Sequence, residues 1–313
     1  LKHIQSCIEQ GTGWGSKDLG STCHRLCIAG AVLLVIMNIV GVGGLIFLVN
    51  FAAATNPASA TLDSVRKSGI LRVGATLDYP PFSLRCKDGS AAGADIDAMD
   101  SLARTLGASI EIVPTTWPTL QSDAAQDRFD IAVGGITVTL ARLRLVAMVP
   151  TGAKSSKIAV ARCGNHLLSL PLDDLDESSI RVGVNPGGTN AAFVHDHLPH
   201  VKVTSLAQGQ QWPSILDGKV NMTVTDSIEA RLEALSKPGE LCAGARPLSS
   251  FSEKGFLLPN RSDVAWRQYV QTWFYKEAST YNHSVDAWLE RQANATLHDS
   301  WACQHGFAVL GLI

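Results

Sequence analysis

The sequence has little charge, since only 17% of its 313 residues are Asp, Glu, Lys or Arg, against about 25% in a typical soluble domain. The formal net charge is −2, so the basic excess that marks a nucleic-acid-binding protein is missing. A low net charge together with 46% hydrophobic residues also excludes a disordered chain. The mean hydropathy of +0.12 leaves two sources of apolarity, a membrane segment or an unusually apolar domain.

The motifs of several enzyme classes are also missing. The chain contains no HExxH, no paired CxxC and no closely spaced cluster of His and Cys, so we expect no metal. It contains no GxGxxG, no P-loop and no GxSxG, so nucleotide cofactors and serine-hydrolase chemistry have no support. We therefore expect a protein that works without a cofactor.

Most of the excess apolarity lies in one segment, residues 27–54, which carries no charged residue. About 20 apolar residues are enough to cross a bilayer. Residues 52–54 and 58–60 read as A-x-A cleavage sites. We interpret 26–60 as a signal peptide or an uncleaved N-terminal membrane anchor, preceded by an unassigned extension over 1–25. In either case the rest of the chain is expected to be extracytoplasmic, periplasmic or secreted, and to contact the membrane only through this segment.

Four cysteines follow this leader, namely Cys86, Cys163, Cys242 and Cys303. An oxidising compartment favours disulfides over buried free thiols. Four cysteines allow three pairings, and the spacing alone does not choose among them.

Beyond residue 60, short β-rich runs alternate with helical patterns at the spacing of βαβ units. The first series predicts strands at 69–76, 110–113 and 129–133 and helices at 96–106 and 120–126. The second series predicts strands at 180–184, 201–203 and 220–224 and helices at 190–197, 212–216 and 227–235. Helices at 264–279 and 284–293 end the pattern.

The two series predict an α/β fold with two lobes, each a mostly parallel sheet flanked by helices. Two strand-like stretches, Lys157–Arg162 and 255–259, are candidates for the segments that cross between the lobes. A ligand cleft is expected between the lobes, because interfaces of this kind are favoured binding sites.

Polar residues stand at the predicted strand ends, where open α/β sheets bind ligands. Arg142 follows Thr137 and could hold a carboxylate with two parallel hydrogen bonds; the alternative is a surface arginine beside Arg144. Thr189 opens a helix after a glycine turn, so backbone N–H groups there could bind an anion. Asp226 is either a helix N-cap or a partner for a ligand ammonium.

An aromatic wall is also predicted. Asp78 and Tyr79 lie on the loop after the first strand, where they could supply a further acceptor and a ring. Trp117, before Pro118, is either a lid on the pocket or a buried anchor. Two anion-binding groups with one or two carboxylates fit a zwitterionic or multiply carboxylated small molecule.

Four motifs resemble the type 2 periplasmic solute-binding proteins of the polar-amino-acid-binding branch, family 3. They are LDYPPFS (77–83), GADIDAMDSLARTLG (93–107), FDIAVGGITVTLAR (129–142) and VTDSIEA (224–230). Six finer motifs resemble the periplasmic cyclohexadienyl dehydratases, enzymes built on this fold: TTWPTL (115–120), DRFDIAVGGIT (127–137), VNPGGTN (184–190), TDSIEARL (225–232), ELCAG (240–244) and SEKGFLLP (252–259).

The resemblance implies a domain over 61–300, with a tail at 301–313. The first lobe would span about 61–156 and 256–300 and the second about 163–250. It also implies that Cys163 pairs with Cys242. The implied ligand-binding residues are Asp78, Tyr79, Trp117, Gly135, Thr137, Arg142, Gly188, Thr189, Asn190 and Asp226.

Within this set, the resemblance gives Arg142 the ligand α-carboxylate, together with Thr137 and the backbone of Thr189. Asp226 would take an amino group. The expected activity is the conversion of arogenate or prephenate to phenylalanine or phenylpyruvate, with loss of water and carbon dioxide. This reaction requires an acid that protonates the departing hydroxyl.

One residue departs from the dehydratase pattern. The resemblance places a glutamate, a strong candidate for the acid, directly after the GGTN motif, where this chain has Ala191. Three explanations remain: another group such as Asp78 or Glu253 supplies the proton, the chain binds without reacting, or it acts on a related compound. A non-catalytic binding protein for an amino acid or aromatic carboxylate, with a possible transporter partner, is therefore the main alternative. An anchored sensor module is a further one.

Overall fold

The computed structural model describes residues 59–259, 261 and 263–294. The predicted extension at 1–25, the tail at 301–313 and nearly all of the predicted leader at 26–60 lie outside these residues, as does Cys303. Within the described ranges, no helix is both long and apolar enough to cross a membrane.

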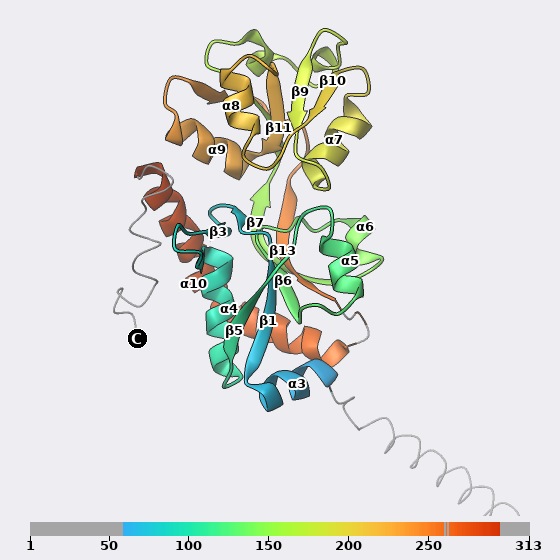
Figure 1. Ribbon diagram of the computed structural model, residues 1–313, viewed down its shortest axis with the longest axis vertical. Coiled ribbons are helices and arrows are strands. Elements are labelled where there is room, and N and C mark those ends of the chain that lie inside the picture. The colour runs from blue at the N-terminus through green and yellow to red at the C-terminus, as the bar shows by residue number, and fades with distance from the viewer. Residues whose placement is uncertain (1–58, 260, 262, 295–313) are drawn as a thin grey trace, which may run out of the picture. The chain divides into compact units, whose positions relative to one another are not determined.

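The first lobe is built on a five-stranded sheet in the order β5-β1-β6-β13-β7 (Figure 1). Its elements are α3 (Ala60–Ser68), β1 (Ile70–Ala75), α4 (Ala94–Thr105), β5 (Ser109–Pro114), α5 (Leu120–Ala125), β6 (Ile131–Val133), α6 (Leu140–Leu143), β7 (Ala147–Ser155), β13 (Ser252–Leu258) and α10 (Val264–Asn294). A small second sheet consists of β2 (Asp78–Tyr79), β3 (Ser83–Arg85) and β4 (Ala91–Ala92). Strand β1 is parallel to β5 and β6, whereas β13 is antiparallel to β6 and β7.

The second lobe repeats this plan with the strand order β10-β9-β11-β8-β12. Its elements are β8 (Lys157–Arg162), η1 (His166–Ser169), η2 (Asp173–Leu175), β9 (Arg181–Val184), α7 (Thr189–His197), β10 (Lys202–Ser205), α8 (Gln211–Leu216), β11 (Met222–Asp226), α9 (Ser227–Ser236) and β12 (Leu241–Ala243). Strand β9 is parallel to β10 and β11, and β8 is antiparallel to β11 and β12. The predicted two-lobed α/β fold is confirmed.

The connections between the lobes differ from the prediction. Lys157–Arg162 does not cross: the whole stretch is β8 and pairs with strands of the second sheet. The chain passes between the lobes at Ser156, after β7, a strand that the sequence pattern did not predict because Pro150 and Gly152 interrupt it. The predicted return at 255–259 likewise belongs mostly to β13 in the first sheet, so the return precedes it, between β12 and β13.

The C-terminal helix also differs from the prediction, because α10 is continuous where two helices were expected. At the expected break, Tyr281 is buried against the first lobe, and this packing favours a continuous helix there. The Tyr281 hydroxyl donates to Oδ1 of Asp95 on α4 at 2.7 Å. Two turns farther on, Trp288 donates its indole N–H to Asp97 at 2.8 Å.

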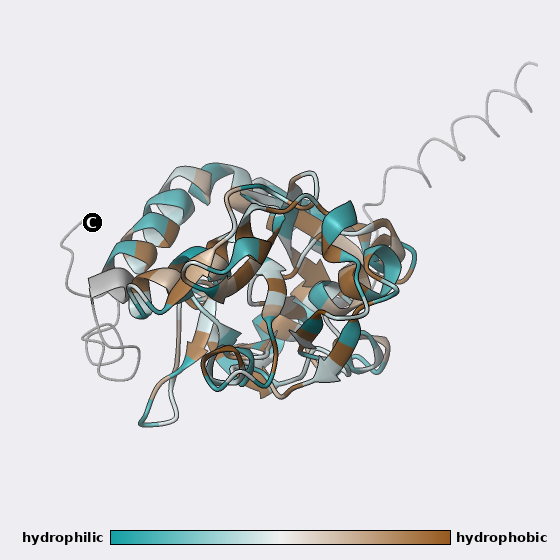
Figure 2. Ribbon diagram, turned by 90° about the horizontal axis from the view of Figure 1, so that it is seen from above, coloured by the Kyte–Doolittle hydropathy of each residue, from teal (hydrophilic) through white to brown (hydrophobic). Residues whose placement is uncertain are grey.

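Each lobe has its own hydrophobic core between the sheet and its helices. In Figure 2, hydrophobic colour runs along the strands, while the helices alternate between hydrophobic and hydrophilic residues, as expected for helices that cover a sheet. Val73, Ile131 and Phe256 in the first lobe and Val182 and Met222 in the second are fully buried. Rigid sheets therefore carry the loops at the strand ends.

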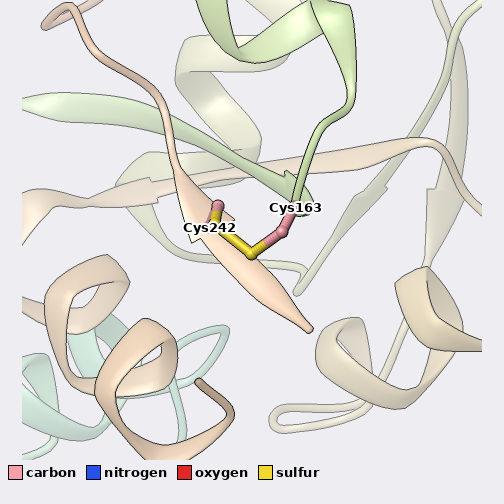
Figure 3. Close-up of a disulfide and its surroundings, with 2 residues drawn as sticks. All are labelled: Cys163 and Cys242. Carbon is pink, nitrogen blue, oxygen red and sulfur yellow. A yellow bond between two sulfur atoms is a disulfide. The ribbon is translucent and has the colours of Figure 1, made fainter. Parts of the chain in front are cut away.

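The predicted disulfide between Cys163 and Cys242 is confirmed, with the two Cα atoms 4.8 Å apart. Cys163 directly follows β8, and Cys242 lies on the neighbouring strand β12 (Figure 3). The backbone N–H of Cys163 also donates to the carbonyl of Glu240 at 3.0 Å. The bridge therefore joins two adjacent strands at the edge of the second sheet.

Candidate functional site

A pocket lies where loops from both lobes meet, and it encloses about 340 Å³, including space open to solvent. The lining residues are Tyr79, Trp117, Gly135, Thr137, Arg142, Asn185, Gly188, Thr189, Asn190, Gln208, Asp226 and Glu229. Nine of the ten residues predicted to bind ligand are among them; Asp78 lies just behind the wall.

Arg142 enters the pocket from α6. Its side chain is buried, with 6% of the residue exposed, so it is not the surface arginine that the sequence also allowed. The Thr139 hydroxyl caps α6 by accepting the backbone N–H of Arg142 at 3.2 Å, and one guanidinium nitrogen donates to the carbonyl of Thr137 at 2.6 Å. Burial lowers the pKa of Arg142, while the nearby charge of Asp226 raises it.

A side chain of α4 fixes the glycine turn that precedes Thr137. The backbone N–H groups of Gly134 and Gly135 in this turn both donate to Oδ2 of Asp95, at 2.8 and 2.9 Å. Gly135 has φ +68°, and a Cβ there would lie 2.5 Å from the ring of Phe82. The turn therefore requires glycine, and it brings Thr137 to the edge of the pocket.

Asp226 lies at the centre of the site, where β11 ends and α9 begins. Its Oδ1 is 2.8 Å from Nζ of Lys157 and its Oδ2 is 2.6 Å from Nζ of Lys254. The Tyr79 hydroxyl donates to the same Oδ2 at 2.8 Å. Burial alone would raise the pKa of Asp226, but the two ammonium groups hold it well below its usual range.

This arrangement differs from the prediction for Asp226. The carboxylate that was expected to take a ligand ammonium already accepts two ammonium groups of the protein's own, one from each lobe. Both lysines are buried, and neither was predicted as a site residue. Lys254 lies in the SEKGFLLP motif, and Lys157 lies in a stretch that was predicted to cross between the lobes. The sequence around a lysine in a strand does not indicate which carboxylate it pairs with.

The two lysines also hold the neighbouring loops. Lys157 donates to the hydroxyl of Thr189 at 2.9 Å and to Oδ1 of Asn190, so it fixes the start of α7. Lys254 donates to the hydroxyl of Thr137 at 3.0 Å and lies 5.1 Å from the centre of the Tyr79 ring. Burial lowers the pKa of Lys157, and Asp226 opposes this effect.

Aromatic side chains form one wall of the pocket. The rings of Tyr79 and Trp117 meet edge to face, with their centres 6.2 Å apart. The indole N–H of Trp117 donates to Oδ1 of Asp78 at 3.2 Å, so Asp78 positions the tryptophan. Burial raises the pKa of Asp78, although its hydrogen bonds with Thr76 and Trp117 lower it.

The structure turns Glu253, one of the two candidate acids, away from the pocket. Successive side chains of a strand point to opposite faces of its sheet. Lys254 reaches Asp226, and Glu253 instead accepts the backbone N–H of Gly152 at 3.0 Å. Glu253 is absent from the pocket lining. The structure therefore does not place the carboxyl of Glu253 where it could protonate a ligand in this pocket.

Sequence reasoning also missed Glu229, on the first turn of α9. Only 7% of this residue is exposed, and it lines the pocket. Its carboxyl accepts hydrogen bonds from the hydroxyl of Thr225 and, at 3.3 Å, from Nε2 of Gln208. Burial raises the pKa of Glu229 to about 7, and the charge of Asp226 acts in the same direction.

The site therefore combines three buried cations, Arg142, Lys157 and Lys254, with one ionised carboxylate, Asp226. The carboxyl of Glu229 is about half protonated at neutral pH. Such a pocket carries an excess of positive charge and one carboxyl group that can donate a proton, so it can hold an anionic ligand and act on it as an acid.

Comparison with known proteins gives four findings. The family model for "Bacterial extracellular solute-binding proteins, family 3" matches residues 71–298. A cyclohexadienyl dehydratase of Pseudomonas aeruginosa is 35% identical over 260 residues, which cover 82% of this chain and 92% of that protein. An L-cystine-binding protein of Escherichia coli is 25% identical over 63% of this chain and 73% of its own length. A solved ancestral amino acid-binding protein, described as a precursor of cyclohexadienyl dehydratase, is 28% identical with a TM-score of 0.68, and the match covers 74% of this chain and all of that one.

Proposed function

The chain belongs to family 3 of the bacterial extracellular solute-binding proteins, and from this premise we propose that it is a cyclohexadienyl dehydratase. The observation that carries the proposal is the 35% identity to such an enzyme across 92% of its length. The site supports it, since Arg142 is placed to bind a carboxylate and the aromatic wall of Tyr79 and Trp117 suits a six-membered ring.

The charges of the site favour a dicarboxylate without an ammonium group. Three cations face one ionised carboxylate, so a dianion compensates the excess charge. Asp226 is already paired with Lys157 and Lys254, and a ligand ammonium would have to compete with both. Prephenate, a keto acid, fits this description better than arogenate, which has an amino group in place of the keto oxygen.

The reaction removes the ring hydroxyl as water and the ring carboxylate as carbon dioxide, and the ring becomes aromatic. Aromatisation supplies much of the driving force, so a site that orients the substrate contributes much of the catalysis. Arg142 would hold a carboxylate from the first lobe. The free backbone N–H groups at the start of α7, around Thr189 and Asn190, would bind from the second lobe.

Turnover by the full-length protein tests the proposal. We expect phenylpyruvate from prephenate and phenylalanine from arogenate, with kcat/KM about tenfold higher for prephenate, a difference of about 1.4 kcal/mol. A rate no higher than the spontaneous acid-catalysed reaction for both compounds would reject a dehydratase. Lys157→Met should narrow the preference for prephenate, because it frees one oxygen of Asp226 for an ammonium group.

A binding protein is the second candidate, and Ala191 is the observation that favours it. The resemblance to the ancestral amino acid-binding protein agrees with this alternative. A ligand at 100 times its Kd stabilises a protein by about 2.7 kcal/mol, so thermal shift with amino acids and aromatic carboxylates would detect it. Stabilisation without turnover would support the binding protein, which would then serve a transporter partner.

We also propose that the protein works outside the cytosol, in agreement with the description of its family as extracellular. Whether residues 26–60 act as a signal peptide or as an anchor is tested by N-terminal sequencing of the mature protein. A mature chain that begins near residue 55 or 61 would identify a cleaved signal, and an intact leader would identify the anchor.

A further inference from the structure

Glu229 is a buried acid whose position is not explained by helix capping. It stands three residues after the N-cap Asp226, the spacing of a capping box in which the glutamate bonds back to the cap. Its hydrogen bonds instead go to Thr225 and Gln208, and its carboxyl lines the pocket. Within the described part of the chain it forms no salt bridge, so nothing stabilises its ionised form by direct contact with a cation.

The loops around Glu229 connect it to the anion-binding part of the site. Thr225, which donates to Glu229, accepts from Nδ2 of Asn190 at 3.1 Å. Asn190 in turn accepts from Lys157. Gln208 bonds both to Glu229 and to the backbone carbonyl of Asp78 in the other lobe, each at 3.3 Å. The carboxyl is thus fixed in place by groups from both sides of the cleft.

We propose that Glu229 is the general acid that protonates the departing hydroxyl; this inference rests on the proposed dehydratase function. It takes the role that the resemblance assigns to a glutamate at position 191. Ala191 has no proton to give, Glu253 faces away, and the carboxylate of Asp78 is bonded to Trp117 behind the pocket wall. Asp226 is paired with two lysines and stays ionised.

The chemical step balances with this residue alone. Prephenate carries a hydroxyl and a carboxylate on opposite carbons of its ring. The proton of Glu229 passes to the hydroxyl oxygen, the carbon–oxygen bond breaks, and water leaves. The electron pair of the bond to the ring carboxylate moves into the ring, carbon dioxide leaves, and the ring is aromatic. The dianion becomes the monoanion phenylpyruvate, and Glu229 regains one proton from solvent.

The surroundings of Glu229 keep its proton available at neutral pH. Burial raises its pKa to about 7, while the hydrogen bond from Thr225 lowers it. Asp226, Glu233 and Asp78 add negative charge nearby, and a bound dianion acts in the same direction. The titratable groups that act on it are Asp78 and Tyr79 on β2, Lys157 on β8, Asp226 on β11 and Glu233 on α9.

Glu229→Gln tests the assignment, because glutamine keeps the size of the side chain and can still accept the Thr225 hydrogen bond. General acids contribute about 10²- to 10⁴-fold to rate, so kcat with prephenate should fall by that factor while the Kd for phenylpyruvate is unchanged. The wild-type kcat/KM should fall as pH rises through about 7. The wild-type kcat should fall at a higher pH, because the bound dianion raises the pKa of Glu229 further. The residual rate of the variant should lose both dependences.

Glu233→Gln is the matched control. Glu233 lies one turn farther along α9 and is equally buried, but it pairs with Lys237 at 3.3 Å and does not line the pocket. Its substitution should leave kcat below pH 7 unchanged and should keep the pH dependence, with a small shift to lower pH because one negative charge near Glu229 is removed. Glu229→Asp, which keeps the acid but shortens its reach, should retain the pH dependence at a reduced rate.

The outcomes separate this assignment from the proposed function. Wild-type turnover that persists in Glu229→Gln with the same pH profile overturns the role of Glu229 and leaves the dehydratase intact. A wild-type protein without turnover overturns the dehydratase and the assignment with it. A folded Glu229→Gln, judged by its unfolding transition, that binds phenylpyruvate and has lost kcat supports the assignment.

Discussion

The first lobe contributes Arg142, Lys254 and aromatic rings to the cleft, whereas the second lobe contributes Lys157, two carboxyl groups and the start of a helix. Arg142 and Lys254 belong to the first sheet and its loops, and Asp226 and Glu229 to the second. The two sets meet directly, since Lys254 and Tyr79 of the first lobe both bond to Asp226. Both lobes therefore carry groups suited to an anion, but the proposed acid comes from the second lobe alone.

If the proposed roles of Arg142 and Glu229 hold, the two lobes must close for the reaction. A substrate carboxylate on Arg142 reaches Glu229 only when the second lobe is against the first. Two-lobed proteins joined by crossing strands commonly close in this way. Lys254 and Asp226 approach to 2.6 Å across the cleft, so this ion pair itself favours the closed arrangement. Substitutions in either lobe can therefore test this arrangement.

The largest loss of activity is expected from a substitution in the first lobe. Arg142→Ala removes the buried guanidinium that we propose binds a substrate carboxylate. Truncating one partner of a buried charged pair costs about 2–5 kcal/mol, so kcat/KM for prephenate should fall by about 1000-fold. Arg144→Ala, at an exposed position two residues away, is the matched control and should leave it unchanged. Activity that survives Arg142→Ala would place the anion site elsewhere.

An effect of similar size, on stability rather than on rate, is expected where the lobes meet. Asp226→Asn leaves Lys157 and Lys254 buried without their shared counter-charge, and breaking a buried pair in this way costs about 3–5 kcal/mol. Urea unfolding should report this loss. Lys254→Met should cost less than Asp226→Asn, because Lys157 still neutralises the carboxylate.

The control for this prediction is Asp217→Asn. Asp217 and Lys219 form an ion pair at 3.1 Å, but both are exposed, and exposed pairs are worth about 0–1 kcal/mol. If Asp226→Asn unfolds at the same urea concentration as Asp217→Asn, the charge cluster does not join the lobes as described.

The sequence was informative where a local rule decides the position of a side chain. Strand ends converge at one edge of an α/β sheet, so the sequence alone predicts that Thr137, Thr189 and Asp226 lie near one another. The glycine turn before Thr137 is also local, because Gly135 has a positive φ and no room for a Cβ.

The rest of the site depends on how the lobes dock, which no local pattern encodes. Whether Glu253 or Lys254 faces the cleft is decided by the register of β13 against β7, and a shift of one residue would exchange them. Lys157 and Lys254 meet at Asp226 from different sheets. Glu229 looks like an ordinary capping glutamate in the sequence, and its burial in the cleft follows from tertiary packing.

The smallest effect is expected from the second lobe, and it concerns stability rather than rate. The folded pKa of Glu229 is raised from 4.5 to about 7. A group with a raised folded pKa contributes stability that is fully present below its unfolded pKa and lost as pH rises through the folded value. A shift of this size corresponds to about 3 kcal/mol at most, so wild-type stability should decline between about pH 4.5 and pH 7 by this mechanism.

Glu229→Gln should remove that decline, so the variant should be more stable than the wild type at pH 8 and no more stable at pH 4. Unfolding in urea at both pH values measures the difference. Glu233→Gln should remove a smaller part, because Lys237 opposes the effect of burial on the pKa of Glu233. A variant that gains stability at high pH while it loses turnover would show that the second lobe keeps Glu229 protonated at a cost to folding. Equal pH dependence in the wild type and Glu229→Gln would mean that Glu229 is solvated and cannot hold its proton at neutral pH.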